Sequence, residues 1–202
     1  MANISYTRTQ RLVGTSVLIA LIVVLQVLAT VTGQLLPATI SLSLVPIIVG
    51  AVLFGPEVGA VLGFAFSMVV FISSISGLDK SGFAMFSINP IATCLIIFIK
   101  GTLSGFLSGI ISNIFSKNNL WLGVICAAII TPVTNTLLFC AGASIFFKEL
   151  ILSWAEGSGI EEQYVFFVCF ALVATNFIVE LIIDIVLSPV IVRIISVLKK
   201  NR

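Results

Sequence analysis

Long apolar segments constrain this chain more than any other feature of its sequence. A helix needs about 20 apolar residues to cross the hydrocarbon core of a bilayer. Five segments reach roughly that length: Leu12–Val31, Val58–Ser76, Ile91–Phe115, Leu120–Phe147 and Tyr164–Leu187. The chain is 59% hydrophobic and only 9% charged, and a soluble domain carries about 25% charged residues. The sequence therefore predicts an all-α membrane protein.

A shorter apolar segment, Leu42–Phe54, lies between the first two of these and ends at Gly55-Pro56-Glu57. We interpret it as the second of six transmembrane helices in one polytopic domain that covers residues 1–202. The sixth helix is expected to stop at Ser188-Pro189, because proline lacks the N–H that a continuing helix requires. An amphipathic basic tail, Val190–Arg202, would then follow it.

The distribution of basic residues predicts how this bundle is oriented. Six spans place both termini on one side of the membrane. That side carries seven lysines and arginines: Arg8, Arg11, Lys117, Arg193, Lys199, Lys200 and Arg202. The opposite side carries only Lys80 and Lys148. Because basic residues concentrate in cytoplasmic loops, we expect both termini to be cytoplasmic.

The connections on the predicted outer side are longer than those on the inner side. They comprise Thr32–Ser41, Ser73–Asn89 and Lys148–Gln163, and they are rich in serine and glycine. Binding and lid functions concentrate in long loops. We therefore expect a site that opens outward and is covered by these loops. Asn89, where the second of them meets the fourth span, is our candidate for a loop residue that contacts ligand.

Polar side chains interrupt the apolar segments and indicate where that site lies. Lys100 lies within the fourth span, Asn135 within the fifth, and Asn176, Glu180 and Asp184 within the sixth. Ionisable groups at membrane depth are costly and usually face a bundle interior or a water-filled cavity. They predict a small polar ligand bound between helices.

Helical rise places three of these residues at a similar height. At 1.5 Å per residue, Lys100, Asn135 and Asn176 lie about 20–25 Å from the predicted inner ends of their helices. A lysine with two carboxamides suits a small anionic ligand that also bears amide or hydroxyl groups. The alternative is structural: Lys100 forms an ion pair with Glu180, and the spacing of Asn176, Glu180 and Asp184 reflects an internal polar seam.

Two features limit the chemistry that the chain can perform. It contains no histidine, and its sequence shows no nucleotide-binding, metal-binding or hydrolase motif. We therefore expect no enzyme activity, no metal site and no cofactor in this chain, and we expect no binding of nucleic acid.

Glycines recur at every fourth position in Gly55–Gly63 and Gly101–Gly109, which predicts close packing of helix backbones.

Several pieces of the sequence together resemble the substrate-binding S components of energy-coupling factor (ECF) vitamin transporters, particularly the pantothenate type. These pieces are TSVLIAL, VPIIVGAVLFGPEVGAVLGFAF, SINP, IKGTLSGFLSGI, TPVTNT and TNFIVELIIDIVLSPVIV. The resemblance extends over roughly Arg11 to Val192. It implies six helices with cytoplasmic termini, and a vitamin pocket near the outer face.

The resemblance also implies a location in the plasma membrane of a prokaryote, and it implies partners and a mechanism. A transmembrane T subunit and two cytoplasmic ATPases would complete the transporter, so that ATP is hydrolysed by the partners. In this family a small-residue patch on the first helix docks the T subunit, and here it corresponds to Ser16 and Ala20. The ligand would be pantothenate, with Asn89, Lys100, Asn135, Asn176 and Glu180 as candidate contacts. The alternatives are another vitamin or precursor in the same fold, or a solitary ion-coupled secondary carrier.

Overall fold

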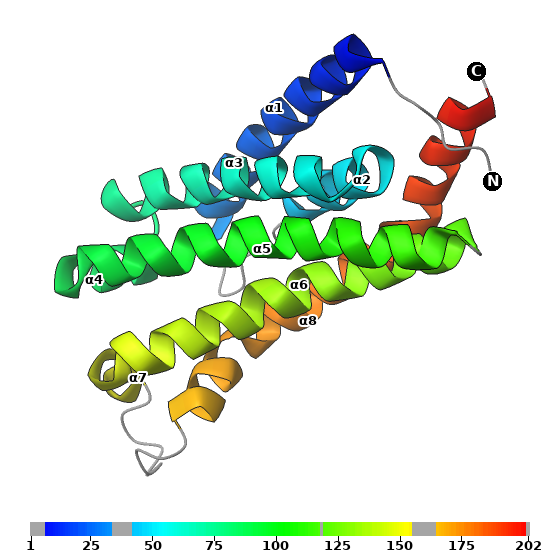
Figure 1. The fold of residues 1–202 in the computed structure, drawn as a ribbon. Coiled ribbons are helices and arrows are strands. Elements are labelled where there is room, and N and C mark those ends of the chain that lie inside the picture. Colours follow the sequence, from blue (N-terminus) through cyan, green and yellow to red (C-terminus); the bar gives the residue numbers. More distant parts are fainter. Residues whose placement is uncertain (1–6, 34–41, 118, 155–164, 201–202) are drawn as a thin grey trace.

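The computed structural model describes residues 7–33, 42–117, 119–154 and 165–200, and these residues form a helical bundle (Figure 1). The helices are α1 (Arg8–Gly33), α2 (Leu44–Phe54), α3 (Pro56–Ile75), α4 (Lys80–Ile88), α5 (Pro90–Ser116), α6 (Leu120–Phe146), α7 (Lys148–Trp154) and α8 (Val165–Lys200). No strand occurs in these ranges. The prediction of an all-α protein is thus confirmed.

Among the residues that the structure describes, four helices, α1, α3, α5 and α6, are long and apolar enough to cross a membrane. The second predicted span, α2, has only 11 residues, which corresponds to about 16 Å of helix. It is too short to cross a bilayer core of about 30 Å in a straight path. The structure therefore supports a multi-pass protein, while the count of six spans and the cytoplasmic termini stay predictions.

Two expectations about helix boundaries are wrong. The connections expected as loops at 73–89 and 148–163 contain the short helices α4 and α7. Pro189 does not end α8, which continues to Lys200. Beyond the proline, Ile191, Val192 and Ile195 are buried in a cluster with residues of α2 and α6. This tertiary burial offsets the backbone hydrogen bond that proline removes.

The glycine-rich faces of α3 and α5 pack backbone against backbone. A methyl group added at Gly63 would overlap the carbonyl oxygen of Gly101, and one added at Gly59 would overlap that of Gly105. Ser67 strengthens the same contact, because its Oγ donates to the Ile97 carbonyl oxygen at 2.8 Å. The predicted packing role of the two glycine series is confirmed. It fixes the separation of the two helices that form one wall of the site.

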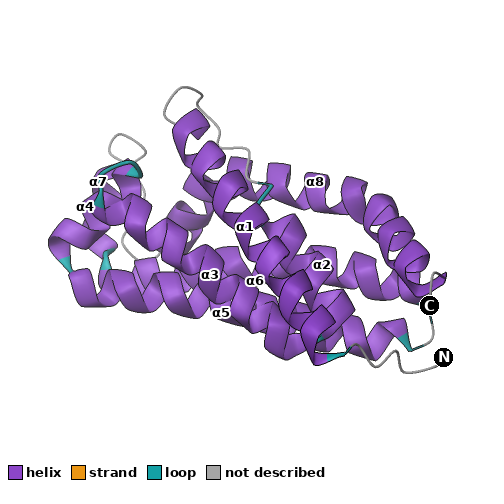
Figure 2. Cartoon of the chain, turned by 90° about the horizontal axis from the view of Figure 1, so that it is seen from above, coloured by secondary structure: helices purple, strands orange, loops and turns teal. Residues whose placement is uncertain are grey.

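The short helices α4 and α7 lie together at one end of the bundle, and the first turns of α1 and last turns of α8 lie toward the other (Figure 2). Near the α4–α7 end, a hydrophobic cluster joins Met85, Ile96, Cys140, Ile151 and Cys169. This cluster ties α4 and α7 to α5, α6 and α8. The connection after α3 is therefore part of the packed structure at that end.

Candidate binding cavity

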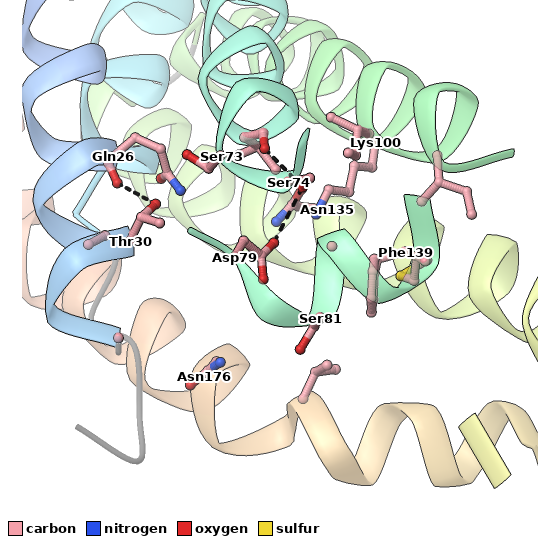
Figure 3. Close-up of a pocket in the computed structure, with 18 of the residues that line it drawn as sticks. Gln26, Thr30, Ser73, Ser74, Asp79, Ser81, Lys100, Asn135, Phe139 and Asn176 are labelled. Atoms are coloured by element: carbon pink, nitrogen blue, oxygen red, sulfur yellow. Dashed lines mark hydrogen bonds between the residues drawn. The ribbon is translucent and has the colours of Figure 1, made fainter. Parts of the chain in front are cut away.

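A cavity of about 480 Å³ lies among α1, α3, α4, α5, α6 and α8, in the part of the bundle that α4 covers. Its volume falls within the range of about 300–1,000 Å³ that small-molecule sites occupy. Polar side chains enter it from each of these helices and from the turn before α4 (Figure 3). They are Gln26, Thr30, Ser73, Ser74, Asp79, Lys80, Ser81, Thr93, Lys100, Asn135, Thr136, Asn176 and Glu180.

Helical periodicity explains why these side chains share one cavity. The lining residues of α5 are Thr93, Ile96, Ile97 and Lys100, and those of α8 are Val173, Asn176, Phe177 and Glu180. Each set follows the spacing i, i+3, i+4, i+7, which produces a single stripe along a helix. The face of α5 that carries the glycines packs against α3. The adjacent face, which carries Lys100, therefore lines the cavity.

Lys100 brings a positive charge into this cavity. Its Nζ lies 4.9 Å from the centroid of the Phe139 ring, a cation–π geometry that positions the ammonium. The carboxylates of Asp79 and Glu180 also attract it electrostatically. Within the described part of the chain, however, the ion pair with a nitrogen–oxygen distance under 4.0 Å is Arg11–Glu57. Lys100 forms no ion pair with a described residue at this distance. The ammonium can therefore accept an anionic partner.

Asn135 presents an unused hydrogen-bonding group in the same cavity as this charge. Only 9% of the residue is exposed, and its Oδ1 has no hydrogen-bond partner among the described residues. A buried amide oxygen without a partner costs free energy, about 1–3 kcal/mol. Because Asn135 lines the cavity, a ligand with an N–H or O–H group would satisfy it.

The first helix contributes residues that our sequence reasoning did not select. Gln26 and Thr30 of α1 line the cavity and lie one helical turn apart. Gln26 Oε1 accepts a hydrogen bond of 2.6 Å from Ser43 Oγ, and Thr30 Oγ1 donates to the Gln26 carbonyl oxygen at 2.9 Å. The sequence signal that could have identified them is a pair of polar residues at i and i+4 within an apolar span.

The turn before α4 supplies a carboxylate that the sequence reasoning also missed. Asp79 lines the cavity together with Ser73, Ser74 and Ser81. Its backbone is held at both sides, because its N–H donates to the Ser73 carbonyl oxygen and its own carbonyl oxygen accepts from Phe83 N–H. A residue in a predicted loop has no helical register, so the direction of the Asp79 side chain could not be predicted.

The predicted site residues do not all belong to the cavity. Lys100, Asn135, Asn176 and Glu180 line it, and Asn89 is not among the lining residues. Asn89 instead caps α5: its Oδ1 accepts a hydrogen bond of 3.1 Å from Ala92 N–H. We therefore correct its expected position, since capping gives this side chain a structural role.

Asp184 lies outside the cavity as well, although it continues the polar series of α8. It is 1% exposed, and its Oδ2 has no hydrogen-bond partner among the described residues. The series Asn176, Glu180, Asp184 is thus divided: the first two residues face the cavity and the third is enclosed by protein. In the described ranges, no group of three histidine, cysteine, aspartate or glutamate side chains could hold a metal ion.

The small-residue patch of α1 lies on a different surface. Ser16 and Ala20 are both exposed, and large apolar side chains surround them, including Leu12 at 65% and Val17 at 62% exposure.

Of the connections expected to cover the site, residues 34–41 and 155–163 lie outside the described residues. Residues 73–74 and 78–82 line the cavity, whereas α7 does not.

Comparison with known proteins gives one family and one relative. Residues 10–192 match the family described as ECF transporter, substrate-specific component. The chain is 26% identical, over 196 residues, to the pantothenic acid transporter PanT of Lactococcus lactis subsp. cremoris (strain MG1363). The alignment covers 92% of this chain and 93% of that relative. No solved structure matches the chain significantly.

Proposed function

Because this chain belongs to the ECF transporter substrate-specific components, a family of multi-pass transport proteins and not of enzymes, we propose that it binds pantothenate in the cavity around Lys100. The observation that carries this proposal is the combination of an ammonium without an ion pair and an unpartnered amide oxygen in one small-molecule cavity. The similarity to a pantothenic acid transporter supports the choice of vitamin.

The chemistry of pantothenate fits the distribution of polar groups. The vitamin carries a carboxylate at one end, an amide in the middle and hydroxyl groups at the other end. Its carboxylate would pair with Lys100, which the Phe139 ring holds from one side. Its amide N–H or a hydroxyl would donate to Asn135 Oδ1, the acceptor that lacks a partner.

The remaining polar groups would read the rest of the ligand. Asn176 and Glu180 enter from α8, and Gln26 and Thr30 enter from α1. Together they offer both donors and acceptors, as a molecule with several hydroxyl and amide groups requires. Apolar walls from Phe66, Ile96, Ile97 and Phe177 would enclose the carbon skeleton.

Transport in this proposal depends on partner subunits. The chain would deliver its vitamin for ATP-driven uptake together with a transmembrane T subunit and two cytoplasmic ATPases, which would hydrolyse the ATP. The exposed patch at Ser16 and Ala20 would dock the T subunit, because small side chains allow helices to approach closely. The exposed apolar neighbours of this patch would then be covered by protein.

Calorimetric titration of the purified protein against a panel of vitamins tests the ligand. Pantothenate should bind and vitamins without a carboxylate should not. Uptake into proteoliposomes tests the mechanism. It should require ATP and the partner subunits. Uptake by this chain alone, driven by an ion gradient, would contradict the proposed coupling and favour a secondary carrier that works through Lys100 and Glu180. Tight binding of a different vitamin would retain the fold and replace the ligand.

A further inference from the structure

Asp79 occupies an unusual position for an aspartate at the start of a helix. It is the N-cap residue of α4, yet its side chain makes no capping hydrogen bond. Aspartate at this position ordinarily accepts from the N–H groups of the first turn. Its carboxylate has instead turned to the cavity, where its hydrogen bond is a long one of 3.5 Å from Ser74 Oγ to Oδ2.

The local packing around Asp79 depends on Gly82. A methyl group at Gly82 would overlap Ser74 Oγ and would lie only 2.5 Å from Asp79 Oδ2. The absence of a side chain at this position therefore lets the first turn of α4 close over the end of α3. It holds the aspartate carboxylate beside the cavity, as the close-up shows for Asp79 and Ser74 (Figure 3).

The charge that Asp79 meets there is that of Lys100. Asp79 and Lys100 line the same cavity, and the carboxylate attracts the ammonium electrostatically. The hydrogen bond between Asp79 and Ser74 is weak at 3.5 Å, so that bond competes little with the attraction to Lys100. Asp79 thus occupies the electrostatic role that a ligand carboxylate would take.

We propose that Asp79 is a built-in competitor for Lys100, which sets how strongly the cavity favours a carboxylate ligand over a neutral one. This inference rests on the proposed function. An anionic ligand must displace the attraction between Asp79 and Lys100 and approach a second negative charge. A neutral ligand of the same shape incurs neither cost. Asp79 therefore weakens anion binding and makes release easier, while the affinity for the neutral form is unaffected.

Replacing Asp79 by asparagine removes the charge and keeps a good N-cap residue. Titrations should use pantothenate and its neutral alcohol, in which a hydroxymethyl group replaces the carboxylate. For Asp79→Asn we expect pantothenate to bind roughly tenfold tighter, as a nearby like charge is removed. The affinity for the alcohol should stay unchanged. Asp79→Ser, with another good capping residue, should give the same ratio between the two ligands.

Glu149→Gln provides the matched control, because Glu149 is an exposed carboxylate in the first turn of α7 and does not line the cavity. It should alter neither affinity. If the Asp79 variants bind acid and alcohol equally more weakly, Asp79 is a direct hydrogen-bond acceptor for the ligand and the inference is wrong. Unchanged affinity for both would also refute it. A wild-type protein that binds neither compound would refute the proposed function, and this inference with it.

Discussion

Removing the charge of Lys100 while keeping its volume is the most direct test of the cavity. Lys100→Met replaces the ammonium by an apolar group of similar length, so the contact with the Phe139 ring is retained in shape. The proposed carboxylate of the ligand would then lose its cation. It would also face Asp79 and Glu180, whose negative charges Lys100 now balances.

The size of the effect follows from the surroundings of the lysine. Truncating one member of a buried charge pair costs about 2–5 kcal/mol or more. Lys100 is half-buried, so solvent screens part of its charge, and the lower part of that range applies. We expect a loss of about 2–3 kcal/mol, which corresponds to roughly 30- to 150-fold weaker binding of pantothenate.

Calorimetric titration of the folded variant measures this loss, and two comparisons make it specific. The neutral alcohol should lose much less affinity than the acid, because it offers no carboxylate to Lys100. Lys80→Met should have little effect, since Lys80 lines the cavity but is exposed, and exposed ion pairs contribute about 0–1 kcal/mol. Equal losses for acid and alcohol, or wild-type affinity in Lys100→Met, would refute a carboxylate at Lys100.

Three further outcomes are expected. Gly63→Ala should lower the free energy of unfolding by about 1–3 kcal/mol, because its methyl group meets the backbone of α5. Gly142→Ala should lower it less in the same melting experiment, because the nearest atoms to its methyl group belong to the Ile96 side chain. Ser16→Trp and Ala20→Trp should prevent co-purification with the T subunit yet leave vitamin binding unchanged; normal assembly in both would place the docking surface elsewhere. Amide hydrogen exchange in 80–88 should slow when ligand is added and stay constant in 113–117; equal exchange with and without ligand would show that α4 does not respond to occupancy.

The sequence predicted the features that depend on helical periodicity. Polar residues at regular spacing in apolar spans share a face, so Lys100, Asn135 and Asn176 could be placed at one level. These three residues line one cavity together with Glu180. The glycine series likewise has a direct geometric meaning, and α3 and α5 do pack through it. The role of these residues in binding stays a prediction.

Features that depend on tertiary contacts could not be predicted in the same way. The position of Asp79 follows from how α4 folds back over α3, which no local pattern encodes. Pro189 favoured a helix end, but the burial of Ile191 and Ile195 against neighbouring helices sustains α8 beyond it. Asn89 looked like a ligand contact because of its place at a loop junction, and the same place made it a helix cap.

The first helix, α1, contributes both to an exposed small-residue patch and to the cavity. One continuous helix carries both the exposed residues Ser16 and Ala20 and the cavity residues Gln26 and Thr30. The two pairs are separated by about 15 Å along the helix axis. A partner protein that moves α1 on docking would also move part of the cavity wall. Thermodynamic linkage then requires reciprocity: if docking changes vitamin affinity by some factor, vitamin changes docking affinity by the same factor. An occupied and an empty subunit would accordingly differ in how well they compete for a shared T subunit.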